Sequence, residues 1–180
     1  EEYLHSYISV LPYNELGAAA AAYNADEKEL CRLDEIYSAA KTPFEIRSGS
    51  EKVTRRFFKI CNNGQESFTG LYKSLTEQGI CKGHQCIAYG LYMRDNGIEL
   101  SEGLAVYGYS ICSAIVTNCV KLVPLSQLAG QKILGESFEL ISSASEKALF
   151  TDINDIGISG AGFDLRAMQH ERLYSRQYMS

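Results

Sequence analysis

Apolar residues recur at helical spacing along most of the chain, and residues that start or stop helices separate the segments. Between 65 and 78 the apolar positions are three or four residues apart: Phe68, Leu71, Tyr72 and Leu75. Gly79 then ends this predicted helix. No alternating strand pattern competes with these segments, so the pattern predicts an all-α fold, a helical bundle in a single domain.

Capping signals predict where helices begin in the first half of the chain. A short helix over 2–10 should end before Pro12, and the alanine run 18–22 has the highest helix propensity in the sequence. Asp26 with Glu29 fits a capping box for a helix that reaches about residue 40. Thr42 with Glu45 fits a second box.

Pro43 follows Thr42 and suits the first position of the helix that this second capping box would start. We expect that helix to end at the Asn-Asn-Gly stretch 62–64, and a later one to cover about 84–94 and end at Asp-Asn-Gly.

In the second half, Ser101 is the expected cap of a long helix that runs to Val123, where Pro124 breaks it. Ser126 is the expected cap of a helix that extends to about Leu149. The stretch 150–164 is rich in Gly, Ser and Asp and predicts a mobile loop. We therefore divide the chain into a helical domain, 1–149, and a loop with a C-terminal tail, 150–180.

The stretch 103–120 contains no charged residue over eighteen positions, which is long enough to raise the question of a membrane span. Many of its residues are Gly, Ser, Tyr, Thr or Asn, and no second such stretch exists. A central helix buried on all sides, with small residues that admit close neighbours, is the preferred interpretation, and no membrane partner is expected.

Composition and charge exclude several functions. The chain has 180 residues, 46% of them hydrophobic and 22% charged, which is typical of a folded globular protein. The net charge of −5 gives no reason to expect a nucleic-acid partner. Six cysteines without a visible secretory signal favour reduced thiols and a cytoplasmic location.

The strongest candidate for metal chemistry is the stretch CKGHQC, 81–86. Thiolates from Cys81 and Cys86 and the imidazole of His84 could bind zinc or nickel, but no fourth ligand or second Cys-x-x-Cys follows. The alternative is two core thiols beside a histidine at a helix start. The glycine-rich GISGAG, 157–162, lacks the Lys and Ser or Thr of a phosphate loop. With no catalytic constellation, we expect no enzyme activity and no cofactor.

The last fifteen residues, RAMQHERLYSRQYMS, are too apolar and aromatic for a solvated chain end. Tyr and Arg are also the residue types that dominate binding energy at interfaces. The sequence therefore predicts a tail that docks on another protein. A tail that folds back on its own helices remains the alternative.

Four stretches resemble the urease accessory protein UreF family, and the similarity spans nearly the whole chain. Two motifs are long and specific: NCVKLVPLSQLAGQKIL, 118–134, and AMQHERLYSRQYMS, 167–180. The TPFEIR stretch, 42–47, and RRFFK, 55–59, also match, as do His84 and Gly90. The chain begins EEYLHSYI, and the family's opening segment that ends in His-Ser-x-Gly-Leu-Glu is absent, so we expect part of the N-terminus to be missing.

The resemblance implies an all-helical, non-enzymatic factor in urease maturation. Such a protein binds the accessory protein UreD (also called UreH), recruits and regulates the GTPase UreG, assists nickel insertion into the urease apoprotein, and forms homodimers. The alternative is a metallochaperone that holds nickel or zinc through Cys81, His84 and Cys86. The expected partner-binding residues are Lys121, Met168, Gln169, His170, Glu171, Tyr174, Ser175, Arg176 and Tyr178.

Overall fold

The computed structural model describes residues 1–61, 64, 66–158 and 160–174, which form helices and turns without a strand. The α-helices are α1 (Glu2–Val10), α2 (Glu15–Asn24), α3 (Glu27–Ala40), α4 (Phe44–Ile60), α5 (Phe68–Glu77), α6 (Gln85–Asp95), α7 (Leu100–Leu122), α8 (Gln127–Glu136), α9 (Phe138–Ala148) and α10 (Ala161–His170). Two short 3₁₀ helices are η1 (Leu11–Tyr13) and η2 (Ile153–Asp155). The predicted all-α class is confirmed.

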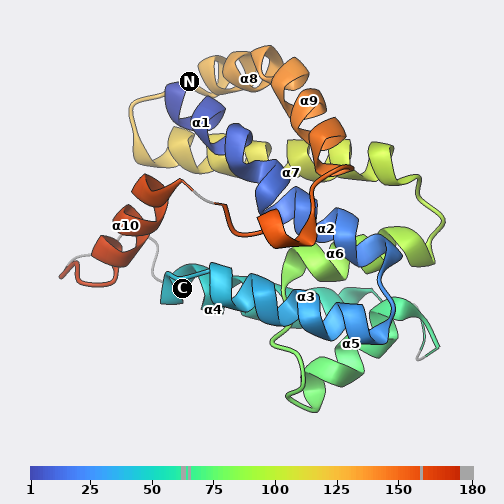
Figure 1. Ribbon diagram of the computed structural model, residues 1–180. Coiled ribbons are helices and arrows are strands. Elements are labelled where there is room, and N and C mark those ends of the chain that lie inside the picture. The colour runs from blue at the N-terminus through green and yellow to red at the C-terminus, as the bar shows by residue number, and fades with distance from the viewer. Residues whose placement is uncertain (62–63, 65, 159, 175–180) are drawn as a thin grey trace.

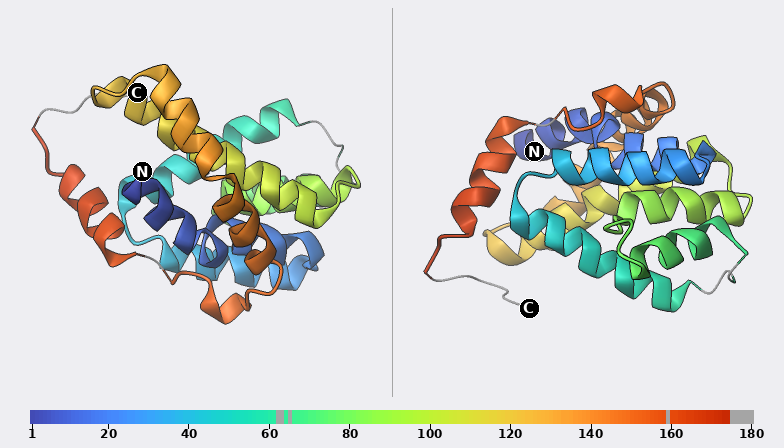
Figure 2. Two further views of the ribbon diagram at one scale, coloured as in Figure 1. Left: turned by 90° about the horizontal axis from the view of Figure 1, so that it is seen from above. Right: turned by 60° about the horizontal axis from the view of Figure 1, so that its bottom comes forward.

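The helices are arranged around a central pair, α2 and α6 (Figure 1). Helices α1, α7, α8 and α9 pack on one side of this pair, and α3, α4 and α5 pack on the other. Helix α10 lies at the edge of the bundle and contacts α4 (Figure 2). The last described segment of the chain is therefore peripheral.

Small side chains allow the backbones of α2 and α6 to approach closely. On α2, Ala18, Ala19 and Ala22 are fully buried. On α6, a Cβ atom added at Gly90 would lie only 2.2 Å from the carbonyl oxygen of Ala19. No methyl group fits at that distance, so the glycine sets the separation of the two central helices.

Two of the predicted caps are confirmed. Asp26 accepts a hydrogen bond from the Glu29 N–H, and the Glu29 side chain accepts one from the Asp26 N–H, which completes the capping box of α3. Ser126 Oγ accepts a hydrogen bond of 3.1 Å from the Ala129 N–H at the start of α8.

Two other predicted caps are wrong. Pro43 has an extended backbone, so α4 begins one residue later, and the Thr42 hydroxyl donates to the Ala40 carbonyl instead. Helix α7 is capped by Glu99, whose carboxylate accepts a hydrogen bond of 3.0 Å from the Glu102 N–H.

The single helix predicted from Ser126 to about Leu149 is two helices, α8 and α9. The break is at Ser137, which is fully buried, and its hydroxyl donates to the Ile133 carbonyl at 2.8 Å. A serine that bonds to the carbonyl four residues earlier competes with the helical ladder and bends it. Nothing in the apolar spacing marks this position.

Helix α7 is not buried on all sides, contrary to the prediction. Gly103, Leu104 and Cys112 are buried, but Val106 is 61% exposed and Tyr109 is 40% exposed. By length and composition alone α7 could cross a membrane, and a third of its most apolar stretch is buried within the bundle. One such helix is weak evidence for a span, because core helices of globular proteins meet the same criterion.

The predicted loop 150–164 is shorter than expected, because α10 begins at Ala161. Its described part is attached to the start of α2. The Gly157 N–H donates to the Tyr13 carbonyl at 2.8 Å, and the buried side chain of Asn14 donates to the Ile158 carbonyl at 3.1 Å. The mobility of this loop and the division of the chain after residue 149 remain predictions.

Replacement of Gly90 by Ala should destabilise the fold by about 1–3 kcal/mol, because the added methyl group meets the Ala19 carbonyl and forces α2 and α6 apart. The matched control is Gly49→Ala in α4, where an added Cβ meets nothing within 4 Å. This second change should stabilise the chain by roughly 0.5–1 kcal/mol. Urea unfolding of both variants measures the difference, and equal stabilities would contradict the close approach.

Candidate partner-binding site

The C-terminal segment, α10 with residues 171–174, is the site predicted from the sequence. No residue of α10 is buried, although Met168 is half-buried. Gln169 and His170 are exposed, and Tyr174 is fully exposed to solvent. Ser175, Arg176 and Tyr178 lie outside the described residues. The described part of the segment therefore presents most of its surface to solvent.

Two polar contacts attach this segment to the start of α4. Glu171 Oε1 accepts a hydrogen bond of 3.0 Å from the Phe44 N–H, and His170 Nδ1 lies 2.7 Å from Glu45 Oε2. The first N–H groups of a helix have no partner within the helix, so a carboxylate from elsewhere in the chain can serve as the cap. Glu45 thus pairs with the C-terminal segment rather than completing the predicted box with Thr42.

An aromatic contact attaches the beginning of α10 to α1. The Phe163 ring packs edge-on against Tyr3 and Tyr7, with ring centroids 5.2 and 5.5 Å apart. Such pairs contribute about 0.5–1.5 kcal/mol beyond the area that they bury. Neither this contact nor the Phe44 and Glu45 contacts were predicted, because residues far apart in sequence carry no local signal of each other.

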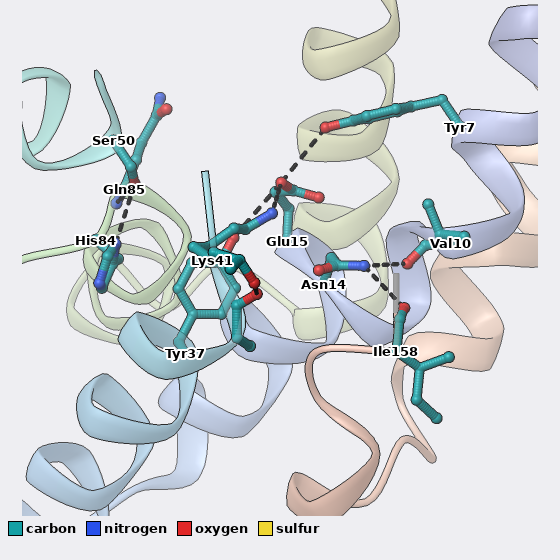
Figure 3. Close-up of polar contacts among 12 residues, drawn as sticks. Tyr7, Val10, Asn14, Glu15, Tyr37, Lys41, Ser50, His84, Gln85 and Ile158 are labelled. Atoms are coloured by element: carbon teal, nitrogen blue, oxygen red, sulfur yellow. Dashed lines mark hydrogen bonds and ion pairs between the residues drawn. The ribbon is translucent and has the colours of Figure 1, made fainter. Parts of the chain in front are cut away.

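Tyr7 also belongs to a polar cluster that joins α1, α2 and the end of α3 (Figure 3). Glu15 Oε1 lies 2.7 Å from Lys41 Nζ, and it accepts weaker hydrogen bonds from Tyr7 and Tyr37 at 3.4 and 3.5 Å. Burial, with the nearby Glu15 charge, raises the pKa of Tyr7 above its usual range. The ion pair of Glu15 with Lys41 is therefore structural. Through its hydrogen bond with Glu15, the cluster also positions the Tyr7 ring that Phe163 contacts.

Figure 3 also shows Asn14, whose amide group bridges two carbonyl oxygens. It donates to Val10 and Ile158, each at 3.1 Å. One side chain thereby links the end of α1 to the chain that leads into α10.

Lys121 lies exposed in the last turn of α7, as predicted, beside the exposed Leu122 and Val123. A cation at this end favours the helix dipole. No hydrogen bond or ion pair joins Lys121 to residues 160–174. Over the part of the chain that the structure describes, Lys121 and the C-terminal segment are thus separate features.

The three candidate metal ligands do not converge on one point. His84 is fully buried, with Nε2 2.8 Å from Ser38 Oγ and Nδ1 3.4 Å from Ser50 Oγ. Cys81 contacts the sulfur of Cys31 instead. Among the residues that the structure describes, no three His, Cys, Asp or Glu side chains form a possible metal site. These side chains thus have the environments of core residues.

Comparison with known proteins bears on these motifs directly. A family model described as UreF matches residues 1–137. This chain belongs to the UreF family. The urease accessory protein UreF of Actinobacillus pleuropneumoniae serotype 5b (strain L20) is 34% identical over 161 residues, which is 89% of this chain and 71% of that protein.

Two further UreF proteins are similar to this chain. The urease accessory protein UreF of Paenarthrobacter aurescens (strain TC1) is 31% identical over 152 residues, 82% of this chain and 67% of that protein. The UreF protein of Streptococcus thermophilus (strain ATCC BAA-491 / LMD-9) is 26% identical over an alignment that covers 100% of this chain and 78% of that protein. The latter match includes the C-terminal segment, which the family model does not reach.

The buried environment of His84 predicts a dependence of stability on pH. Burial lowers the pKa of His84 to about 4, whereas an unfolded histidine titrates near 6.5. Between these values only the unfolded chain takes up the proton. The contribution of the neutral, buried His84 to the free energy of unfolding is therefore fully present above about pH 6.5, and it is lost as the pH decreases toward 4.

Because of His84, we expect the free energy of unfolding to fall by roughly 2 kcal/mol between about pH 7.5 and pH 5. Urea unfolding at both pH values measures it. The variant His84→Gln has no ionisable group, so it should show a smaller loss over the same range. An unchanged pH dependence in the variant would assign the loss to other groups.

Proposed function

We propose that this chain is a non-catalytic scaffold of urease maturation, which binds the accessory protein UreD (UreH) and recruits and regulates the GTPase UreG. The family and its accessory role are given by the relatives named above. The observation that carries the proposal is the exposure of the C-terminal segment over its described part, where Gln169 and His170 are exposed and Tyr174 is fully exposed.

The segment has the chemistry of a docking element. Met168 and Tyr174 supply apolar and aromatic surface, while Gln169, His170 and Glu171 supply hydrogen-bonding groups. Ser175, Arg176 and Tyr178 complete the proposed contact set. Aromatic residues and arginines contribute most to binding when a partner removes them from water.

The remaining parts of the proposal follow from the family and the composition. The chain acts in the cytoplasm, as a homodimer, and assists nickel insertion into the urease apoprotein, with nickel as cargo. It binds neither nucleic acid nor a membrane, in keeping with its net charge of −5. Direct metal binding by Cys81, His84 and Cys86 has no geometric support, and calorimetry with nickel on the reduced chain tests it independently.

Deletion of residues 168–180 should abolish or sharply weaken binding of a UreD-type partner while the bundle stays folded. The fold should survive because Phe163 and its contacts with Tyr3 and Tyr7 are retained. Affinity measured by calorimetry, beside a thermal melt, gives both quantities. Normal binding by the truncated chain would contradict the proposal, and unfolding would show that the segment belongs to this protein's own core.

Point variants sharpen this test. Tyr174→Ala and Arg176→Ala should each weaken partner binding by about 2 kcal/mol or more. Because Tyr174 is fully exposed, its replacement should leave the melting temperature unchanged. Phe150→Ala is the matched control, since this aromatic side chain is 87% exposed and lies outside the C-terminal segment.

Lys121→Ala should reduce recruitment of UreG by the complex and lower the stability by only about 0.3–1 kcal/mol, the usual contribution of a cation at a helix C-terminus. Lys132→Ala on α8 is the control, because the side chain of that lysine is 75% exposed and its ion pair with Glu136 is long, at 3.7 Å. Pull-down with UreD and UreG compares the two. Equal recruitment by both variants would remove Lys121 from the proposed contact set.

A further inference from the structure

Two cysteines outside the C-terminal segment lie with their sulfur atoms in contact. Cys31 is on α3 and Cys81 is in the connection between α5 and α6, and their Sγ atoms are 3.9 Å apart. All six cysteines are free thiols. Across the described residues, this is the one contact between two thiols. The fold therefore brings together a pair that fifty positions separate in the sequence.

The backbone around Cys81 is fixed by Asp34, which is three residues after Cys31 on α3. The Asp34 carboxylate accepts hydrogen bonds from the Lys82 N–H at 2.7 Å, the Gly83 N–H at 3.1 Å and the Tyr72 hydroxyl at 2.5 Å. Residues three apart lie on the same face of a helix, so Cys31 and Asp34 face the same connection. These bonds hold the two sulfur atoms in contact.

The two thiols differ in access to solvent. Cys31 is half-buried and borders shallow depressions on the surface of α3, whereas Cys81 is 2% exposed. Burial, and then the negative charge of Asp34, raise the pKa of the Cys81 thiol. A small oxidant therefore reaches the sulfur of Cys31 first, and Cys81 is placed to react second.

We propose that Cys31 and Cys81 form a reversible disulfide when the chain meets hydrogen peroxide. The Cys31 sulfur attacks a peroxide oxygen. An S–O bond forms, the O–O bond breaks, and one water leaves with the thiol proton. The Cys81 sulfur then attacks Cys31, an S–S bond forms, the S–O bond breaks, and a second water leaves. Two thiols are oxidised and one peroxide is reduced.

The change in geometry is small. A disulfide places its sulfur atoms about 2.05 Å apart, so each would move by roughly 1 Å. The bond would connect α3 to the α5–α6 connection and restrain the unfolded chain over a long loop. Disulfides in reducing compartments are usually transient and respond to oxidants, which is the behaviour proposed here.

The test uses the purified, reduced chain and hydrogen peroxide. Two of the six thiols should be lost, the mass should fall by about 2 Da, and peptide mapping without reductant should show Cys31 linked to Cys81. Dithiothreitol should reverse all three changes. The oxidised chain should also melt several degrees higher, since the cross-link lowers the entropy of the unfolded state.

Variants separate the proposed pair from general oxidation. Cys31→Ser should abolish the cross-link. Cys119→Ser, which removes another half-buried thiol, should leave it intact. In Cys81→Ser, Cys31 should stop at the sulfenic acid, which dimedone traps. If the buried Cys81→Ser variant does not fold, Cys31→Ser and Cys119→Ser still decide the outcome.

The proposal would be overturned by a link between other cysteines, by a bond between two chains, or by oxidation of Cys31 to a sulfinic acid without a cross-link. A link between other cysteines and a sulfinic acid each have a distinct mass on the peptide map, and a bond between two chains doubles the mass of the undigested protein. The experiment contains no urease component, so its result is independent of the proposed role in urease maturation.

Discussion

The close approach of α2 and α6 is the constraint on which the rest of the structure depends. The carbonyl oxygen of Ala19 occupies the space where a side chain at position 90 would begin. Because these two helices occupy the centre, their separation determines where α7 and α9 pack on one side and where α3, α4 and α5 pack on the other (Figure 1). The alanine run of α2 is therefore a packing surface as well as a strong helix former.

The C-terminal segment stands in contrast to this centre. Its attachments in the described part of the chain include the aromatic contacts of Phe163 and the contacts of His170 and Glu171 with the start of α4. Polar contacts at exposed positions contribute about 1 kcal/mol or less each, because water competes for the same groups. A partner that buries Tyr174 and its neighbours can therefore replace these contacts at small cost. His170 and Glu171 contact the start of α4, whereas Tyr174 is fully exposed, so a partner could bind Tyr174 without displacing the bundle.

The sequence predicted the helices well because helical spacing, Pro, Gly and capping residues are local signals. The capping box at Asp26 and the cap at Ser126 are of this kind. The predictions failed for two different reasons. Glu45 is predicted to bond within its own helix but faces His170, a residue that is distant in the sequence. The break at Ser137 is local, but it depends on a buried hydroxyl that the apolar spacing does not record. The fold class was thus predictable, whereas the contacts of the candidate site were not.

The stretch CKGHQC shows why ligand-like spacing in a sequence is weak evidence for a metal. Its residue types suit zinc or nickel, yet the surrounding helices direct His84 and Cys81 to different neighbours. Asp34 accepts a hydrogen bond from the backbone next to Cys81. The hydroxyl groups of Ser38 and Ser50 contact the two ring nitrogens of His84. The spacing of these residues gives no sign that Cys81 contacts Cys31, which lies on helix α3. The chemistry available to this stretch is therefore decided by the packing of α3 against it.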